Sequence, residues 1–181
     1  DGKQIDYLYS VIDKKELKLK PFQRAKNTTF NKPPALIFEN KFSISANELL
    51  EYITNYCCRK YWVDNVVSFE YNLNEVTRVG TEHACVINQK HLNFTTVVKE
   101  VKPEQLVYGE LTTSAQPIDE LYQFFIISPL TPNSCKLTIE VYIKSKTIFK
   151  QVLFYVLLKK TFNKSIGKNL KKLSMFIESK N

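Results

Sequence analysis

The pattern of apolar and polar residues divides the chain into a strand-rich middle and a helical C-terminal part. Between Val66 and Ile143, apolar stretches alternate with turn residues at intervals of about ten positions, which is typical of consecutive antiparallel strands. This spacing predicts six strands, at Val66–Leu73, Arg78–Ile87, Leu92–Val101, Leu106–Thr113, Tyr122–Ser128 and Cys135–Ile143. In the last strand apolar residues alternate with polar ones, so we expect the sheet to have one solvated face.

Helices and one further strand flank this middle region. Ala35–Ser43 has strand composition, and the Ser45-x-x-Glu48 capping box that follows it predicts a helix of about three turns. From Thr147 to Ser179, apolar residues recur at steps of three and four, which predicts one long amphipathic helix. Its first half, Ile148–Leu158, is apolar on nearly every side. We therefore expect the sheet to enclose this half and to leave the distal half partly exposed.

A double proline at Pro33 and Pro34 marks the expected start of the compact domain, because proline blocks helices and donates no ladder hydrogen bond. We predict that residues 1–34 are an N-terminal extension or linker. Residues 35–181 then form one domain, in keeping with a chain of 181 residues.

The order of elements defines an α+β fold: a strand, one or two short helices, six strands and a long C-terminal helix. One helix covers the apolar face of a seven-stranded antiparallel sheet only when the sheet curves and wraps around it. Three local features accompany this order: the strand Phe38–Phe42 leads into the capped helix at Ser45, Tyr61-Trp62 precedes the second strand, and Val79-Gly80-Thr81 begins the third. In this order of elements and in these features, the chain resembles the START-like (SRPBCC) superfamily and its helix-grip fold.

The START-like superfamily includes polyketide cyclase/dehydrase and lipid-transport proteins. The resemblance covers residues 35–179 and implies that a hydrophobic or amphipathic small molecule or lipid is held between the sheet and the long helix. Catalysis is implied for a minority of members. Non-catalytic binding, as a regulatory module of a larger protein, is therefore the favoured hypothesis, and a cyclase, dehydratase or hydrolase in the same cavity is the alternative.

The distribution of charge along the chain limits the classes of partner that the protein is expected to bind. The formal net charge is +8, but residues 1–34 carry eight basic and four acidic side chains and residues 144–181 carry ten basic and one acidic, which leaves the middle net acidic. Only three arginines are present, so we expect no nucleic-acid partner. The C-terminal helix carries a basic stripe of Lys159, Lys160, Lys164, Lys168, Lys171 and Lys172. This stripe is either a solvated face or a contact for an anionic membrane, a neighbouring domain or a second subunit, and a homodimer stays open.

The four cysteines form neither a CxxC pair nor a Cys/His cluster. We expect no metal, no cofactor and no disulfide framework, which favours a reducing, cytoplasmic compartment. The longest apolar run, Val152–Leu158, is too short to cross a bilayer.

Aromatic residues are the main candidates for ligand contact, although filling an ordinary core is the competing interpretation. The predicted ligand-binding residues are Trp62, Phe69, Tyr71, Phe94, Tyr108, Phe124, Phe154 and Phe162. Tyrosine hydroxyls, Glu110 and Thr96 are the candidate polar groups that orient a ligand.

Glu82, His83 and Glu110 are the candidate catalytic residues, because a buried carboxyl or imidazole can act as an acid or base. His83 shares a strand face with Cys85, since the two are two positions apart. Structural packing of this pair is favoured over a nucleophile or a metal site, and Glu82 on the opposite face is expected in solvent more often than in a site.

Overall fold

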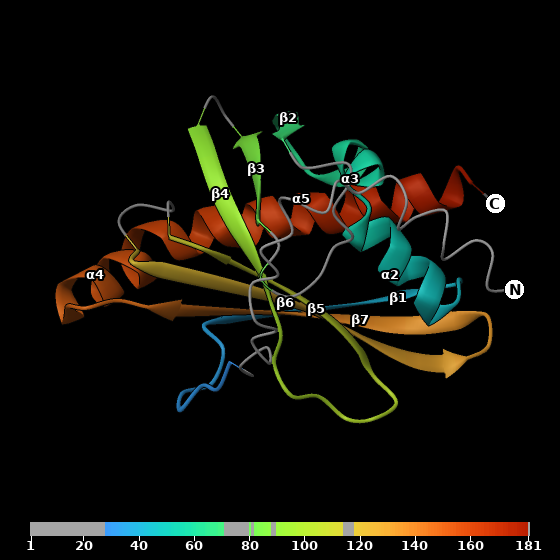
Figure 1. Cartoon of the computed structure of the whole chain (residues 1–181), viewed down its shortest axis with the longest axis horizontal. Helices are drawn as coiled ribbons and strands as arrows, with labels where there is room; N and C mark the ends of the chain where they lie inside the picture. Colours follow the sequence, from blue (N-terminus) through green and yellow to red (C-terminus); the bar gives the residue numbers. More distant parts are fainter. Residues whose placement is uncertain (1–27, 71–79, 81, 88–89, 114–117, 181) are drawn as a thin grey trace, which may run out of the picture.

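The computed structural model describes residues 28–70, 80, 82–87, 90–113 and 118–180. In these residues one antiparallel sheet is crossed by a long C-terminal helix (Figure 1). The strands are β1 (Leu36–Phe42), β2 (Val66–Glu70), β3 (Glu82–Ile87), β4 (Lys90–Val97), β5 (Leu106–Thr112), β6 (Glu120–Thr131) and β7 (Ser134–Lys144). The helices are α2 (Ala46–Thr54), α3 (Tyr56–Trp62), α4 (Ile148–Leu153), the π-helical turn η1 (Phe154–Leu158) and α5 (Lys159–Glu178).

The sheet has seven strands in the order β1-β7-β6-β5-β4-β3-β2, and every neighbouring pair is antiparallel. The predicted α+β helix-grip fold is therefore confirmed. Strand ends differ from the prediction: β6 continues past Pro129, which had suggested a turn. A register shift between Pro129 and Thr131 accommodates the proline, because a bulge leaves one residue out of the ladder.

Two helices follow β1 because two polar side chains cap them in succession. The Ser45 hydroxyl accepts a hydrogen bond from the Glu48 backbone N–H at 3.2 Å, as the capping box predicts. Asn55 has an extended backbone that ends α2, and its side chain accepts from the Cys57 N–H at 2.9 Å to begin α3. This break turns the chain so that α3 lies against α5, as well as against β2.

The inner face of the sheet carries the main hydrophobic core. Side chains from α2 and α5 pack there against β1, β6 and β7 and exclude solvent, the most buried being Leu49, Ile53, Phe125, Ile127, Leu137, Val141 and Leu173. This half of the inner face is filled by close packing.

The outer face is covered over part of its area, contrary to the expected fully solvated face. Tyr122, Phe124, Ile126 and Tyr142 form a second buried cluster there. The ring of Phe30 stacks on Tyr142 with centroids 3.9 Å apart and meets Tyr122 edge-on. Phe30 of the predicted extension thus packs on the sheet, whereas the domain boundary at Ala35 stays a prediction because residues 1–27 lie outside the described part.

The first half of the C-terminal helix is exposed, which corrects the expectation that the sheet encloses it. Within Ile148–Leu158 the fully buried side chain is Phe154, and six large apolar side chains are exposed: Ile148, Phe149, Val152, Tyr155, Val156 and Leu157. The distal half, expected to be the more exposed, buries Ile166, Leu173 and Ile177. An all-round apolar run shows that a segment can be buried, but tertiary contacts decide whether it is.

Gly109 in β5 provides a test of the packing on the outer face, where it is the register partner of Phe124. A Cβ at this position would lie 2.6 Å from the ring of Phe124 and 2.7 Å from the carbonyl oxygen of Val97, and Phe124 is fully buried. We expect Gly109→Ala to lower the free energy of unfolding by about 1–3 kcal/mol. Gly167→Ala is the control: nothing lies within 4 Å of its Cβ in α5, so alanine raises stability by roughly 0.5–1 kcal/mol. Urea denaturation measures both, and a neutral Gly109→Ala would contradict this packing.

Candidate functional site

Three buried polar side chains from separate elements meet on the inner face of the sheet. Arg59 comes from α3, His83 from β3 and Glu110 from β5, and their exposed fractions are 6%, 5% and 4%. Arg59 binds Glu110 through two hydrogen bonds, from Nη1 to Oε1 and from Nη2 to Oε2, the latter at 3.0 Å. His83 Nε2 lies 3.3 Å from Glu110 Oε1. These residues, with Tyr56 and Tyr108, are called the polar cluster below.

Two tyrosines complete the hydrogen bonds of the polar cluster. Tyr108 Oη donates to Glu110 Oε1 at 2.8 Å, and Tyr56 Oη lies 2.9 Å from His83 Nδ1. An imidazole that donates from Nε2 to the carboxylate leaves Nδ1 to accept from the Tyr56 hydroxyl. A continuous chain therefore runs from Tyr56 through His83 to Glu110.

Strand register and helix periodicity bring these residues together. Tyr108 and Glu110 are two positions apart and share one face of β5, and Glu110 is the register partner of Thr96 in β4. In α3 the buried positions are Tyr56, Arg59 and Trp62, three residues apart and so on one side of the helix. The inward sides of α3 and β5 thus meet at the Arg59–Glu110 ion pair.

Aromatic rings surround the polar cluster. The guanidinium carbon of Arg59 lies between 5.6 and 6.0 Å from the ring centroids of Trp62, Tyr56, Phe69 and Tyr108. Phe94 stacks on the imidazole of His83 with centroids 5.2 Å apart. These contacts are favourable for a cation and keep water away from the ion pair.

Burial and the ion pair fix the charge of the groups in and beside the cluster. Burial acts to raise the pKa of Glu110, but the Arg59 guanidinium and the hydrogen bond from His83 hold that pKa well below its usual range. Burial raises the pKa of the Cys85 thiol to about 12, and it raises the pKa of Tyr108 as well. At neutral pH the site therefore holds a carboxylate, a neutral thiol and a neutral phenol.

Two buried polar atoms beside Glu110 have no hydrogen-bond partner among the described residues: Arg59 Nε and Thr96 Oγ1. Both Arg59 and Thr96 belong to the buried polar residues of the molecule. Buried polar atoms in native proteins nearly always bond to protein, water or ligand. Arg59 Nε and Thr96 Oγ1 are therefore two polar atoms of the site whose hydrogen-bonding capacity the described residues leave unused.

The structure brings together most of the residues predicted from the sequence. His83 and Glu110 are in direct contact, and Trp62, Phe69, Phe94 and Tyr108 lie around them. Phe154 and Phe162 contact each other on the C-terminal helix, with centroids 5.7 Å apart, and belong to or pack against the inner core. Tyr71 lies outside the described residues.

Two predicted site residues lie elsewhere. Phe124 was expected beneath the helix, but it points to the outer face, where Phe30 covers it. The alternation along β6 causes this: its neighbour Phe125 takes the inward position and packs with Tyr108. Glu82 was a catalytic candidate, but its side chain is exposed, on the face of β3 opposite to His83.

Sequence reasoning missed Arg59 and the role of the Tyr56 hydroxyl. The available signal was a basic residue at the apolar spacing of a helix, three positions after Tyr56 and three before Trp62. A charge at a core-facing position needs a buried partner. The sequence could not identify that partner, because Glu110 lies 51 residues further along the chain.

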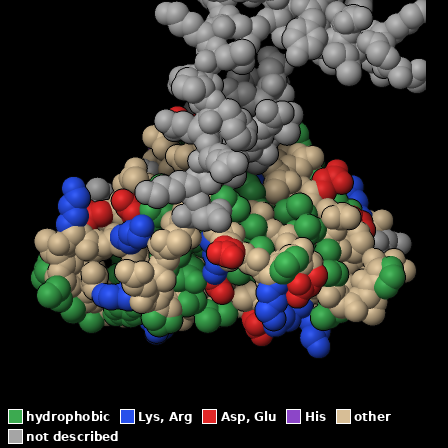
Figure 2. Space-filling model, turned by 60° about the horizontal axis from the view of Figure 1, so that its bottom comes forward, with side chains coloured by type: hydrophobic (Ala, Val, Ile, Leu, Met, Phe, Trp, Pro, Cys, Tyr) green, Lys and Arg blue, Asp and Glu red, His purple; other side chains and the backbone are tan. Residues whose placement is uncertain are grey.

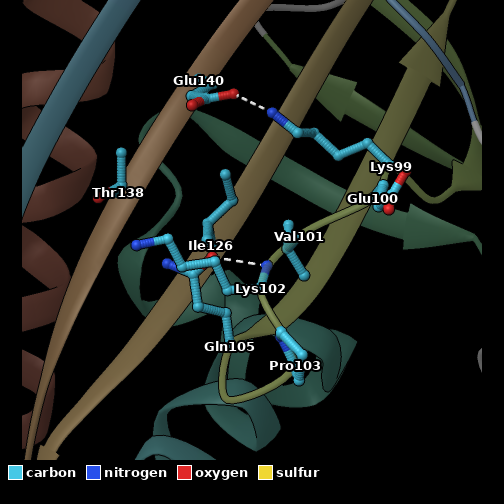
Figure 3. Close-up of a pocket in the computed structure, with 9 residues that line it drawn as sticks. All are labelled: Lys99, Glu100, Val101, Lys102, Pro103, Gln105, Ile126, Thr138 and Glu140. Atoms are coloured by element: carbon cyan, nitrogen blue, oxygen red, sulfur yellow. Dashed lines mark hydrogen bonds and ion pairs between the residues drawn. The ribbon is translucent and has the colours of Figure 1, made fainter.

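Two surface grooves lie away from the polar cluster. One, of about 580 Å³, is on the outer face where the segment after β4 crosses β6 and β7 (Figure 3). Its lining includes Lys99, Lys102 and Glu140, and Lys99 already pairs with Glu140. This polar groove does not match the apolar site expected beneath the helix, and the cavity between sheet and helix stays a prediction.

Metal ligands do not gather in the described part of the chain: no three His, Cys, Asp or Glu side chains there are placed to hold an ion. Among the same residues, no helix is long and apolar enough to span a membrane. No disulfide joins Cys57, Cys58, Cys85 or Cys135.

Comparison with known proteins identifies similar folds without similar sequences. No protein-family model and no curated protein matches the chain. A START superfamily protein from Mycobacterium smegmatis has a TM-score of 0.56 at 16% identity, over 81% of this chain and 98% of that one. A norcoclaurine synthase point mutant from Thalictrum flavum, solved with a transition-state analogue, has a TM-score of 0.54 at 12% identity, over 81% of this chain and 95% of that one.

The di-domain ARO/CYC protein BexL from the BE-7585A biosynthetic pathway gives a TM-score of 0.62 at 11% identity, over 79% of this chain and 46% of BexL. Identities this low show a common fold and no more. The shared fold agrees with the seven-stranded sheet and the long C-terminal helix described above.

Proposed function

We propose that this chain, which has the helix-grip fold of START-like proteins, binds a hydrophobic or amphipathic small molecule or lipid over β3–β5, beneath the C-terminal helix, without transforming it. One observation carries the proposal: the two unpartnered buried atoms, Arg59 Nε and Thr96 Oγ1, on an inner face otherwise lined by aromatic rings. Small-molecule sites combine apolar walls with a few polar groups in this way.

The polar cluster limits the chemistry of the ligand. Arg59 Nε is a donor, so the ligand presents an acceptor such as a hydroxyl, carbonyl or carboxylate oxygen. The charge of Arg59 is already balanced by Glu110, so the ligand need not be anionic. Phe69 and Phe94 supply apolar surface next to that polar point. A mainly apolar molecule with one oxygen function fits these features.

The charge states favour binding over acid–base catalysis. Glu110 is held as a carboxylate by Arg59, so it is a poor proton donor and a weak base at neutral pH. The raised pKa of Cys85 keeps its thiol protonated, whereas a nucleophile needs the thiolate. Together these groups orient a ligand without readily exchanging protons with it.

An enzyme of the cyclase, dehydratase or hydrolase kind is the second candidate, and the Tyr56–His83–Glu110 chain favours it. A hydroxyl joined to an imidazole that a carboxylate orients is a common arrangement for proton transfer. Binding and catalysis are distinguished by adding the ligand recovered from one sample of the protein to a fresh, ligand-free sample. A binder leaves it chemically unchanged in mass and chromatographic position, and an enzyme converts it.

A cytoplasmic location and a role as a regulatory module of a larger protein remain part of this proposal. Four cysteines without a disulfide support a reducing compartment, because extracellular proteins usually pair their cysteines.

Two adjacent threonines on β4 offer a matched test of the binding site. Thr96 points to the inner face opposite Glu110, whereas Thr95 points to the outer face. Thr96→Leu adds bulk beside the polar cluster and removes the hydroxyl, so we expect the apolar probe 1-anilinonaphthalene-8-sulfonate to bind at least ten-fold more weakly. Thr95→Leu is expected to bind like the wild type. Titration follows probe fluorescence and the emission of the chain's single tryptophan, Trp62.

Saturable binding of one probe molecule per chain supports the proposal, provided that circular dichroism shows both variants folded. Unsaturable probe binding, or equal loss of affinity in both variants, would contradict it.

A further inference from the structure

The first half of the C-terminal helix presents a continuous apolar surface to solvent. Ile148, Phe149, Val152, Tyr155 and Val156 lie along α4 and η1 at spacings of one, three and four residues, and each is between 49% and 79% exposed. These five residues are called the apolar helix face below. They lie on one side of the helix, as i, i+4, i+7 spacing requires. A contiguous patch of large exposed apolar side chains indicates an interaction surface.

The π-helical turn explains how this face coexists with a packed distal helix. In η1 the Lys159 N–H bonds to the Phe154 carbonyl oxygen, five residues back, so the turn is wider than an α-helical one. Phe154 points to the core, while Tyr155 and Val156 face solvent. Helix α5 then continues with Ile166, Leu173 and Ile177 on its buried side.

Positive charge borders the apolar helix face at both ends. Between Val141 and Ile177 the sequence has nine lysines and neither aspartate nor glutamate. Lys146 precedes the face, and Lys159 and Lys160 follow it; Lys150 is bound to Asp119. Figure 2 shows hydrophobic side chains exposed at the end of the molecule where Figure 1 places α4, with blue Lys or Arg side chains near them.

A groove of about 560 Å³ involves the same helix. Gln151 and Tyr155 line it together with Lys32 and Lys144, which come from the N-terminal segment and the end of β7. The ammonium of Lys144 lies 5.3 Å from the Phe30 ring centroid. Lys32 and Lys144 therefore stand next to the apolar helix face, and Lys144 pairs with Glu120 at 3.8 Å.

We propose that the apolar helix face docks on an anionic lipid bilayer, with Phe149, Val152 and Val156 entering the interface and the neighbouring lysines contacting lipid phosphates. Helices that lie in the plane of a bilayer combine one apolar side with lysines at its border. Tyrosine at the boundary, here Tyr155, is typical of the membrane interface. Each lysine near an anionic surface adds to the attraction.

A second copy of the chain is a poorer occupant of this face. In a two-fold contact the same surface is used by both copies, so the bordering lysines of one would meet those of the other. No acidic residue lies between Val141 and Ile177, and the nearby Asp119 and Glu120 are already paired with Lys150 and Lys144. The charge pattern fits an extended negative surface better than a copy of itself.

Flotation with vesicles of phosphatidylcholine alone or with 30% phosphatidylserine, at low and high salt, tests the docking. The wild type is expected to float with the anionic vesicles, less at high salt, and to remain unbound with phosphatidylcholine. Phe149→Ser/Val156→Ser reduces the bound fraction at least ten-fold. Met175→Ser is the matched control, since Met175 is 59% exposed on the distal part of the same helix; it binds like the wild type.

The variant Lys159→Gln/Lys160→Gln tests the contribution of charge. We expect it to bind anionic vesicles more weakly and with a smaller dependence on salt. The docking is contradicted if the wild type does not bind anionic vesicles, or if the bound fraction of Phe149→Ser/Val156→Ser equals that of the wild type. It is equally contradicted if these serines only dissociate a dimer in sedimentation equilibrium. The Thr96→Leu variant, which changes only the internal site, should float like the wild type, so that failure of the docking is separate from failure of the internal site.

Discussion

Replacing Glu110 by alanine is expected to lower the free energy of unfolding by about 3–5 kcal/mol, because it leaves the Arg59 guanidinium buried without its counter-charge. Arg59 is 6% exposed and both of its Nη atoms bond to this carboxylate. Tyr108 and His83 also lose their acceptor. Urea denaturation followed by Trp62 fluorescence and by circular dichroism measures the loss.

The double variant Arg59→Met/Glu110→Leu is the control for this loss. It removes both charges together, so it avoids the unpaired cation and is expected to be clearly more stable than Glu110→Ala. A Glu110→Ala protein within about 1 kcal/mol of the wild type, the cost of an ordinary substitution, would show that the buried ion pair does not form.

Stability is expected to fall steeply when the pH drops below about 5, because the folded protein holds the pKa of Glu110 below its unfolded value. A carboxyl with a lowered folded pKa contributes its full stability above the unfolded pKa. That contribution is lost as the pH falls towards the folded pKa, where the folded state also takes up the proton. Urea midpoints between pH 7 and pH 3 measure this dependence.

The same double variant, Arg59→Met/Glu110→Leu, isolates the contribution of Glu110. The difference in free energy of unfolding between this variant and the wild type should be constant above about pH 6. At lower pH the variant should lose less stability than the wild type. Glu39→Gln is the exposed control: the bond to Lys136 lowers the pKa of Glu39, but this pair lies in solvent. Its pH profile should follow that of the wild type, because exposed ion pairs contribute little. Parallel profiles for all three proteins would contradict the assignment.

Residue periodicity was sufficient to predict the order of the strands and the cap at Ser45, because these depend on neighbours in sequence. The caps at Asn55 and Thr147 were not predicted. Ser45 and Glu48 form the predicted capping bond, and Leu137, Ile139 and Val141 alternate into the core as expected. The face of β6 could not be predicted, since Phe124 and Phe125 are both apolar. Register with β5 and β7 decides which of them points inward.

The candidate site was predicted in part for a similar reason. His83 and Glu110 were recognised because polar residues within apolar strands are conspicuous, and the fold brings them together. Arg59 was missed because its partner is distant in sequence, and a basic residue in a helix is usually solvated. The exposed α4 was also missed, because an apolar run gives no sign of whether the protein or an external surface covers it.

The measurement that tests the central proposal most directly is native mass spectrometry of the protein purified from its own source under non-denaturing conditions. The expected spectrum contains the chain with one additional apolar or amphipathic molecule, which organic solvent releases. The Thr96→Leu variant should carry less of it and the Thr95→Leu variant should carry as much as the wild type. A spectrum with the bare chain alone, from a folded wild-type protein that also fails to bind the fluorescent probe, would contradict ligand binding beneath the C-terminal helix.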